Sequence, residues 1–117
     1  MSYLFLWYPK CSTCQKAKKW LDENGVDYIE RDIKENHPTA EEIKLWQEKS
    51  DLPLKRFFNT SGLLYKNMQL KEKLPDMDAK EQIALLATDG MLVKRPLIIG
   101  EKQGLTGFKP MEWETLK

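Results

Sequence analysis

The first third of the chain alternates between apolar and amphipathic segments. Residues 3–7 form a short, mostly apolar run that Pro9 ends, and they predict a strand buried on both faces. Residues 12–24 place apolar side chains on one helical face and lysines on the other, and this predicted helix ends at Gly25. Residues 26–33 alternate as a second strand. A strand, a helix and a strand with short connections predict a βαβ unit with parallel strands.

The middle of the chain is predicted to be helical. Thr39 followed three residues later by Glu42 is a capping box, which predicts the start of a helix. Asp78 and Glu81 form a second capping box and predict the start of another helix. Between these two helices, we expect shorter helical pieces on either side of a turn at residues 59–62.

The last part of the chain predicts a β-hairpin and a closing helix. Residues 97–99 and 105–108 are apolar runs separated by a glycine-containing turn, which indicates an antiparallel pair of strands. Pro110 fits the first turn of a final helix. The order of elements predicts one α/β domain over residues 1–117. We expect a thioredoxin-like, four-stranded mixed sheet with a helical insertion at about 39–90, after the second strand.

Composition and charge narrow the function classes. The chain has 117 residues, of which 41% are hydrophobic and 32% charged, and its net charge is +1. This balance gives no reason to expect nucleic acid or an anionic membrane as a partner. The apolar start of the chain is too short for a secretory signal, and no apolar run approaches the roughly 20 residues of a membrane-spanning helix. We therefore expect a cytoplasmic protein. We also expect a monomer without a bound cofactor.

The only two cysteines, Cys11 and Cys14, are three residues apart at the predicted start of the first helix. Permanent disulfides are rare in a reducing compartment, so this spacing favours redox chemistry or metal binding. A structural zinc site needs about four Cys or His ligands, and the chain adds only His37, which precedes Pro38 in a polar loop. We therefore expect no metal site.

The start of a helix is a place where a thiol becomes reactive. The thiolate is the nucleophile, and the unpaired N–H groups and the dipole at a helix start stabilise its negative charge. Lys10 is adjacent to Cys11 and adds positive charge. Cys14 lies in the first turn, so we predict attack by Cys11 on a substrate and resolution of the mixed species by Cys14. The alternative is that both cysteines are small buried side chains of the core.

Lys94, Arg95 and Pro96 precede the third predicted strand. A proline is tolerated at the start of a strand, and an X-Pro bond can be cis, so we expect a cis bond between Arg95 and Pro96. In a thioredoxin-like sheet this segment lies against the cysteine turn. Arg95 then either faces Cys11 and stabilises an anion, or extends into solvent as an ordinary loop arginine, and sequence spacing leaves both readings open.

Three motifs together resemble the ArsC/Spx family: Tyr8-Pro9-Lys10-Cys11-Ser12-Thr13-Cys14-Gln15-Lys16-Ala17, Lys94-Arg95-Pro96-Leu97 and Gly107-Phe108-Lys109-Pro110. The resemblance covers essentially the whole chain and implies a thioredoxin-like fold in which Cys11 is the reactive residue. In the glutaredoxin-type arsenate reductases of this family, one cysteine attacks arsenate and three arginines hold its oxygens. Arg95, beside the expected cis Pro96, matches one of these arginines. Lys109 and Asn59 stand where the other two are expected.

These departures from the arsenate reductases imply weak arsenate binding. Arginine offers a rigid two-pronged fork to an oxyanion, whereas lysine is a point charge and asparagine carries no charge. Those reductases use glutathione for the later steps and need no second cysteine in this motif. Here Cys14 is placed to form an internal disulfide with Cys11, as in the Spx branch.

The Spx branch implies a different kind of partner, because its members bind the C-terminal domain of the RNA polymerase α subunit and use the cysteine pair as a redox switch. Spx proteins typically carry a longer charged C-terminal tail than this sequence has, so we do not favour a role in transcription. We favour a thiol–disulfide oxidoreductase and keep an arsenate reductase and a Spx-like regulator as alternatives. The substrate would be a protein disulfide, a small mixed disulfide or an oxyanion, and the electron donor glutathione or thioredoxin. The candidate substrate contacts are Lys10, Pro96, Lys109 and Asn59.

Overall fold

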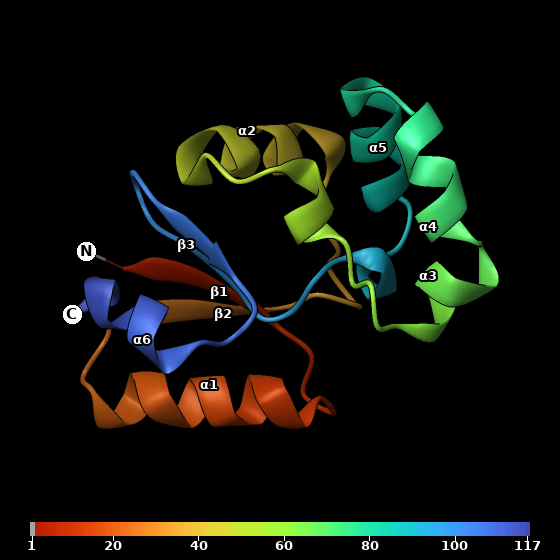
Figure 1. Cartoon of the computed structure of the whole chain (residues 1–117). Helices are drawn as coiled ribbons and strands as arrows, with labels where there is room; N and C mark the ends of the chain where they lie inside the picture. The colour runs from red at the N-terminus through yellow and green to blue at the C-terminus, as the bar shows by residue number, and fades with distance from the viewer. Residues whose placement is uncertain (1) are drawn as a thin grey trace.

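The computed structural model describes residues 2–117, which form a central four-stranded sheet with helices on both faces (Figure 1). In sheet order the strands are β2 (Tyr28–Asp32), β1 (Tyr3–Trp7), β3 (Leu97–Ile99) and β4 (Gly104–Thr106). β1 pairs in parallel with β2, whereas β3 runs antiparallel to both β1 and β4. The predicted α/β class and the mixed four-stranded sheet with a helical insertion after β2 are therefore confirmed.

The two faces of β1 carry different halves of the core, because successive side chains of a strand point to opposite sides. Phe5 packs below the sheet of Figure 1 with helices α1 (Ser12–Glu23) and α6 (Pro110–Trp113). Leu6 packs on the other face against the insertion. Both Phe5 and Leu6 are fully buried, so β1 is enclosed from both sides at its centre, as its apolar run predicts.

The insertion is built from short helices: α2 (Ala40–Ser50), η1 (Leu54–Phe57), α3 (Leu63–Asn67), α4 (Leu70–Lys73), η2 (Leu74–Asp76), α5 (Ala79–Leu86) and η3 (Gly90–Leu92). Both predicted capping boxes are present. The side chains of Thr39 and Asp78 accept from backbone N–H groups in the first turn, and Glu42 and Glu81 accept from the capping residues in return. No helix within residues 2–117 is long and apolar enough to span a membrane.

A short antiparallel contact ties the insertion to the segment that leads into β3. Residues 57–59 run alongside residues 92–94 and are bridged at their centre. The N–H groups of Asn59 and Lys94 donate to carbonyl groups across this contact at 2.8 and 2.7 Å. The contact therefore holds η1 beside the approach to β3.

Two strands are displaced relative to the sequence prediction. β2 begins at Tyr28 and not at residue 26, because the Val26 N–H donates to the Leu21 carbonyl at the end of α1 (3.0 Å). β4 ends at Thr106 and does not continue to residue 108. The reason is Gly107, which has a positive φ of 72° and turns the chain away from β3.

An ion pair joins β2 to the start of the insertion. The Nη1 and Nη2 groups of Arg31 donate to the two carboxylate oxygens of Glu42 at 2.7 and 2.9 Å. The guanidinium also lies 5.8 Å from the centre of the Trp46 ring. The pKa of Glu42 is lowered to about 2, chiefly by the hydrogen bonds from Arg31 and further by the N–H of Thr39. Glu42 therefore caps α2 and fixes it to the sheet.

Replacing Glu42 with glutamine tests this ion pair. Glutamine can still cap α2 but carries no charge, so we expect Glu42→Gln to lower the free energy of unfolding at pH 7 by about 1 kcal/mol. Because the folded-state pKa is depressed, the charge stabilises the fold in full above pH 4.5, and this contribution is lost as the pH falls through about 2. Urea denaturation should show that the difference in free energy of unfolding between wild type and Glu42→Gln becomes smaller as the pH falls from 4.5 to about 2.

Glu48→Gln is the matched control, because Glu48 is exposed on the same helix. It should leave stability unchanged at both ends of the pH range. A Glu42→Gln difference that stays constant down to pH 2 would contradict the role given to the ion pair.

Candidate active site

Cys11 is the residue immediately before the first helical residue of α1, Ser12. Its backbone is extended (φ −93°, ψ 121°), and its carbonyl accepts from the Gln15 N–H at 3.0 Å. Its own N–H donates to the Tyr8 carbonyl at 2.9 Å. The Gln15 side chain donates to the Pro9 carbonyl at 2.7 Å. These bonds fix the turn that leads into α1 and hold Cys11 at the start of the helix.

The two thiols have opposite pKa shifts. Burial by itself would raise the pKa of Cys11, but the N–H and the thiol of Cys14, the charge of Arg95 and the N–H of Thr13 hold it below its ordinary value. Burial raises the pKa of Cys14 to about 12, and the hydrogen bond and charge of Cys11 add to this rise. Cys14 is 0% exposed, whereas Cys11 is half-buried. The two shifts therefore favour ionisation of the accessible Cys11 sulfur over ionisation of the buried Cys14 sulfur behind it.

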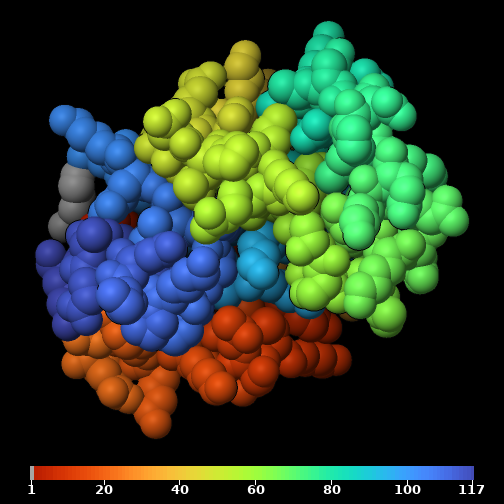
Figure 2. Space-filling model, in the orientation of Figure 1, coloured from red at the N-terminus to blue at the C-terminus, as the bar shows by residue number. Residues whose placement is uncertain are grey.

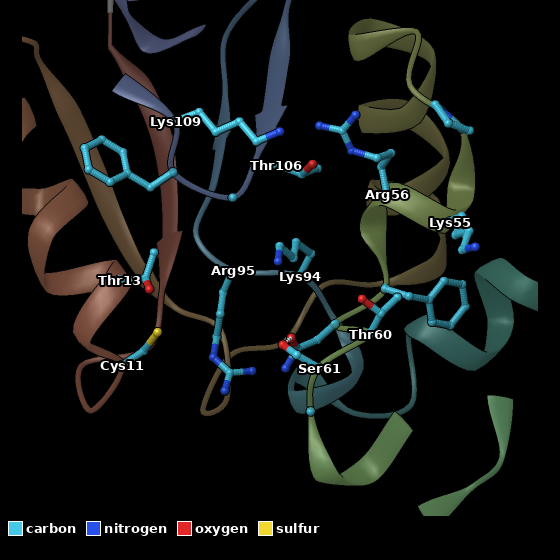
Figure 3. A pocket seen from close by; sticks show the side chains of 16 residues that line it. Cys11, Thr13, Lys55, Arg56, Thr60, Ser61, Lys94, Arg95, Thr106 and Lys109 are labelled. Carbon is cyan, nitrogen blue, oxygen red and sulfur yellow. Dashed lines mark hydrogen bonds between the residues drawn. The ribbon is translucent and has the colours of Figure 1, made fainter. Parts of the chain in front are cut away.

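Arg95 lies at the same end of the site as Cys11 (Figure 3). Its guanidinium is 5.2 Å from the centre of the Tyr8 ring, and its buried Nε and Nη1 atoms have no hydrogen-bond partner in residues 2–117. The Arg95–Pro96 peptide bond is cis, as predicted. Since buried guanidinium N–H groups are normally paired, this geometry leaves Arg95 with donors for an anion next to the sulfur.

A cavity of about 650 Å³ opens in front of Cys11. In Figure 2 the start of α1 (red), the insertion (yellow-green) and the turn after β4 (blue) surround it, and the segment before β3 (light blue) lies between them. Within residues 2–117 no Asp or Glu lines the cavity. Its lining includes five cations: Lys55, Arg56, Lys94, Arg95 and Lys109.

The structure brings together most of the residues proposed from the sequence. Arg95, Lys109 and Asn59 line the cavity with Cys11, although Asn59 is only 8% exposed. Cys14 lies behind Cys11 and not on the cavity wall. The other two candidates border the site without lining it: Lys10 is exposed in the turn before α1, and Pro96 is buried and accepts a backbone hydrogen bond from Gly107.

Sequence reasoning missed three of the cations, Lys55, Arg56 and Lys94. Lys55 and Arg56 belong to η1 and are part of no sequence motif. They reach the cavity because the end of η1 leads into residues 57–59, which pair with residues 92–94 far along the chain. Lys94 was noted only as part of the motif before β3. Its proximity to Arg95 in the sequence was the one available signal.

Side chains that bind metals do not gather at this site. Within residues 2–117 there is no group of three or more His, Cys, Asp or Glu side chains that could hold a metal ion. His37, the histidine weighed as a ligand, is exposed in the loop before α2. The cavity wall brings the Cys11 thiol together with five cations, and the Cys14 thiol lies behind Cys11.

Comparison with known proteins identifies the family. The model of the ArsC family matches residues 6–116. An ArsC family related protein from Bacteroides fragilis is 61% identical, with a TM-score of 0.97 over 100% of this chain and 98% of its own. The uncharacterized protein YusI of Bacillus subtilis (strain 168) is 54% identical over 114 residues, which is 97% of each chain. The chain belongs to the ArsC family, whose members share its thioredoxin-like fold.

Regulators of transcription are also among the proteins to which this chain is similar. The global transcriptional regulator Spx 2 of Bacillus anthracis is 26% identical over 102 residues, covering 87% of this chain and 76% of the regulator. The resemblance noted in the sequence is therefore confirmed at the level of the family. The activity of this chain has to be inferred from the residues of its own site.

Alkylation of Cys11 at different pH values tests the electrostatics of the site. We expect the midpoint to lie below the value of about 8.5 for a free thiol, and Arg95→Gln to move it upward, because the substitution removes a nearby positive charge. Mass spectrometry of the alkylated peptide identifies which sulfur has reacted. Lys71→Gln, on the exposed face of α4, is the control. A midpoint that Arg95→Gln leaves in place would contradict the contribution of Arg95.

Proposed function

We propose that this chain is a cytoplasmic, monomeric thiol–disulfide oxidoreductase in which Cys11 attacks, Cys14 resolves and Arg95 stabilises negative charge. The observation that carries the proposal is the placement of three groups: Cys11 is half-buried at the start of α1, Cys14 is fully buried in the first turn behind it, and Arg95 lies at the same end of the site with unpartnered donors. The lowered pKa of the accessible sulfur increases the share of Cys11 that is in the nucleophilic thiolate form. A raised pKa at the buried sulfur keeps the second thiol protonated until the first has reacted.

The first half of the reaction is an exchange between a thiolate and a disulfide. The Cys11 thiolate attacks one sulfur of the substrate, the substrate S–S bond breaks, and the departing thiolate keeps the electron pair. Cys14 then loses its proton and attacks the Cys11 sulfur, which releases the second substrate thiolate and leaves a Cys11–Cys14 disulfide. Two electrons have moved to the substrate, and an external thiol such as glutathione or thioredoxin returns them to the cysteine pair.

The high pKa of Cys14 is compatible with the second step. Burial is its largest cause, but the hydrogen bond and the negative charge of Cys11 also contribute. Once the Cys11 sulfur is bonded to the substrate, it is no longer negative, so both of these contributions disappear. Cys14 is therefore easier to deprotonate at the stage when it must attack.

The cavity supplies room and charge for the substrate. Arg95 has two unpartnered buried nitrogens beside Cys11, so it can donate to the thiolate or to an oxygen of the substrate. Lys109 and Asn59 line the same cavity as Cys11 and are proposed as substrate contacts. Lys10 lies in the turn before α1, next to Cys11 in the sequence, and Pro96 lies at the entry to β3, next to Arg95.

Reduction of a model disulfide by the wild type and by two cysteine variants tests the proposed function. We expect Cys11→Ser to reduce turnover to the rate of the uncatalysed exchange, because serine is not a thiol nucleophile. Cys14→Ser should react once and accumulate a mixed disulfide on Cys11, since no neighbour can resolve it. The adduct is seen as a mass increase of one substrate half, and it should disappear when dithiothreitol is added.

Two outcomes would contradict the assignment of roles. Turnover by Cys11→Ser at the wild-type rate would remove Cys11 from the chemistry, and unchanged turnover by Cys14→Ser would remove the resolving role of Cys14. An arm with arsenate as the substrate, with glutathione or thioredoxin as donor, tests the reductase alternative. We expect little turnover above the Cys11→Ser control, because only Arg95 supplies an arginine fork at the sulfur.

A second candidate function is redox-dependent binding to the C-terminal domain of the RNA polymerase α subunit. It is favoured by the relative that is named a transcriptional regulator, together with the close cysteine pair. Formation of a Cys11–Cys14 disulfide removes the thiolate beside Arg95, so the charge of the surface depends on oxidation. A pull-down with that domain, in reduced and oxidised states, should show retention in one state if this function holds. Absence of retention in both states would dismiss it.

A further inference from the structure

Positive charge is concentrated at the cavity. The whole chain carries a net charge of only +1, yet five cations line this one cavity, and within residues 2–117 no carboxylate lines it. Like charges around one cavity repel one another, so the arrangement is more favourable when an anion is present. The charge is therefore suited to an anionic ligand.

The cations occupy two ends of the cavity. Arg95 lies beside Cys11 at the lower end of Figure 3. At the upper end, Arg56 from η1 and Lys109 from the turn after β4 reach toward one another from opposite walls (Figure 3). Lys94 lies between the two ends. A ligand that touches both ends must therefore carry its anionic group at a distance from the atom that meets the sulfur.

Backbone contacts, and not ion pairs, determine where Arg56 lies. The Arg56 N–H donates to the Pro53 carbonyl at 3.0 Å, and η1 continues directly into residues 57–59, which pair with the segment before β3. The ion pairs found within residues 2–117 are made by other cations: Lys18, Lys19, Arg31 and Lys117. The guanidinium of Arg56 is therefore presented at the cavity without a protein carboxylate to neutralise it.

We propose that Arg56 and Lys109, together with Lys94, form an anion subsite that binds a carboxylate or phosphate while the substrate sulfur reaches Cys11. The inference rests on the proposed function and names its substrate class: disulfides of small thiols that carry an anionic group several bonds from the sulfur. The cavity of about 650 Å³ lies within the range of small-molecule sites, roughly 300–1,000 Å³. Disulfides that lack an anionic group can occupy the same cavity, but they form no charge-assisted contact with this subsite.

The selectivity is read from a single exchange step, so that the test does not depend on turnover. The Cys11 thiolate attacks a probe disulfide, the probe S–S bond breaks, and the released thiolate is measured as it forms. The carboxylate probe is dithiobis(nitrobenzoate), the phosphate probe is coenzyme A disulfide, and the neutral probe is dithiodipyridine. Each rate for an anionic probe is divided by the rate for the neutral probe on the same protein, which cancels changes in the nucleophilicity of Cys11.

The substitutions form a graded series at Arg56. We expect Arg56→Gln to lower the anionic-to-neutral rate ratio by about three- to ten-fold, from the loss of one charge-assisted contact. Arg56→Lys should retain most of the ratio, and Arg56→Glu should lower it further. Added salt should narrow the gap between wild type and Arg56→Gln, because mobile ions screen the interaction. Lys71→Gln, remote from the cavity, should leave every rate unchanged.

Each outcome decides the proposal. A lower ratio for both anionic probes, or for the carboxylate or the phosphate probe alone, supports the subsite and identifies the group that it binds. Equal ratios in wild type, Arg56→Gln and Arg56→Glu would overturn it. Failure of the proposed function is a separate result, namely no catalytic disulfide reduction by a protein whose Cys11 still reacts with the probes in a charge-selective manner.

Discussion

A thiolate in a protein needs hydrogen-bond donors and positive charge nearby, and Cys11 receives them from two parts of the chain that are far apart in sequence. The start of α1 supplies the N–H groups of Thr13 and Cys14, and the segment before β3 supplies the charge of Arg95. Both must be correctly placed at once. The antiparallel pairing of β1 with β3 achieves this, because it brings the strand that leads to Cys11 beside the strand that follows Arg95.

The insertion gives this sulfur a surrounding cavity. A thioredoxin-like sheet with α1 alone would expose Cys11 on an open surface, whereas η1 adds a wall opposite the turn after β4. The wall is anchored twice: Phe57 and Leu54 are buried in the core beneath it, and residues 57–59 are bonded to residues 92–94. The ion pair between Arg31 and Glu42 secures the other end of the insertion to the sheet.

Features that depend on neighbouring residues could be predicted from the sequence. The capping boxes at Thr39 and Asp78 each involve residues within one turn, and both are found as expected. Cys11 and Cys14 carry the same kind of local signal, namely a cysteine at the start of a helix. Helix α3 carries no such signal, because a helix of five residues is too short to show an apolar period.

Features that depend on distant contacts could not be predicted. Arg56 has no motif, and it reaches the cavity only because the chain pairs with itself across the whole insertion. Sequence spacing also left the direction of Arg95 open, and in the structure its guanidinium packs against the Tyr8 ring at the same end of the site as Cys11. The start of β2 was misplaced for a similar reason, since the Val26 N–H donates to the Leu21 carbonyl of α1.

The two-sided core places the cysteine pair and the proposed anion subsite in different parts of the molecule. α1, which carries the sulfurs, packs below the sheet with Phe5, whereas η1, which carries Arg56, packs above it with Leu6. Substitutions in η1 can thus alter which molecules enter the cavity without disturbing the start of α1, which stabilises the ionised form of Cys11. Homologous proteins with this fold could therefore differ in the substrates that they accept and still keep the same arrangement around the two sulfurs.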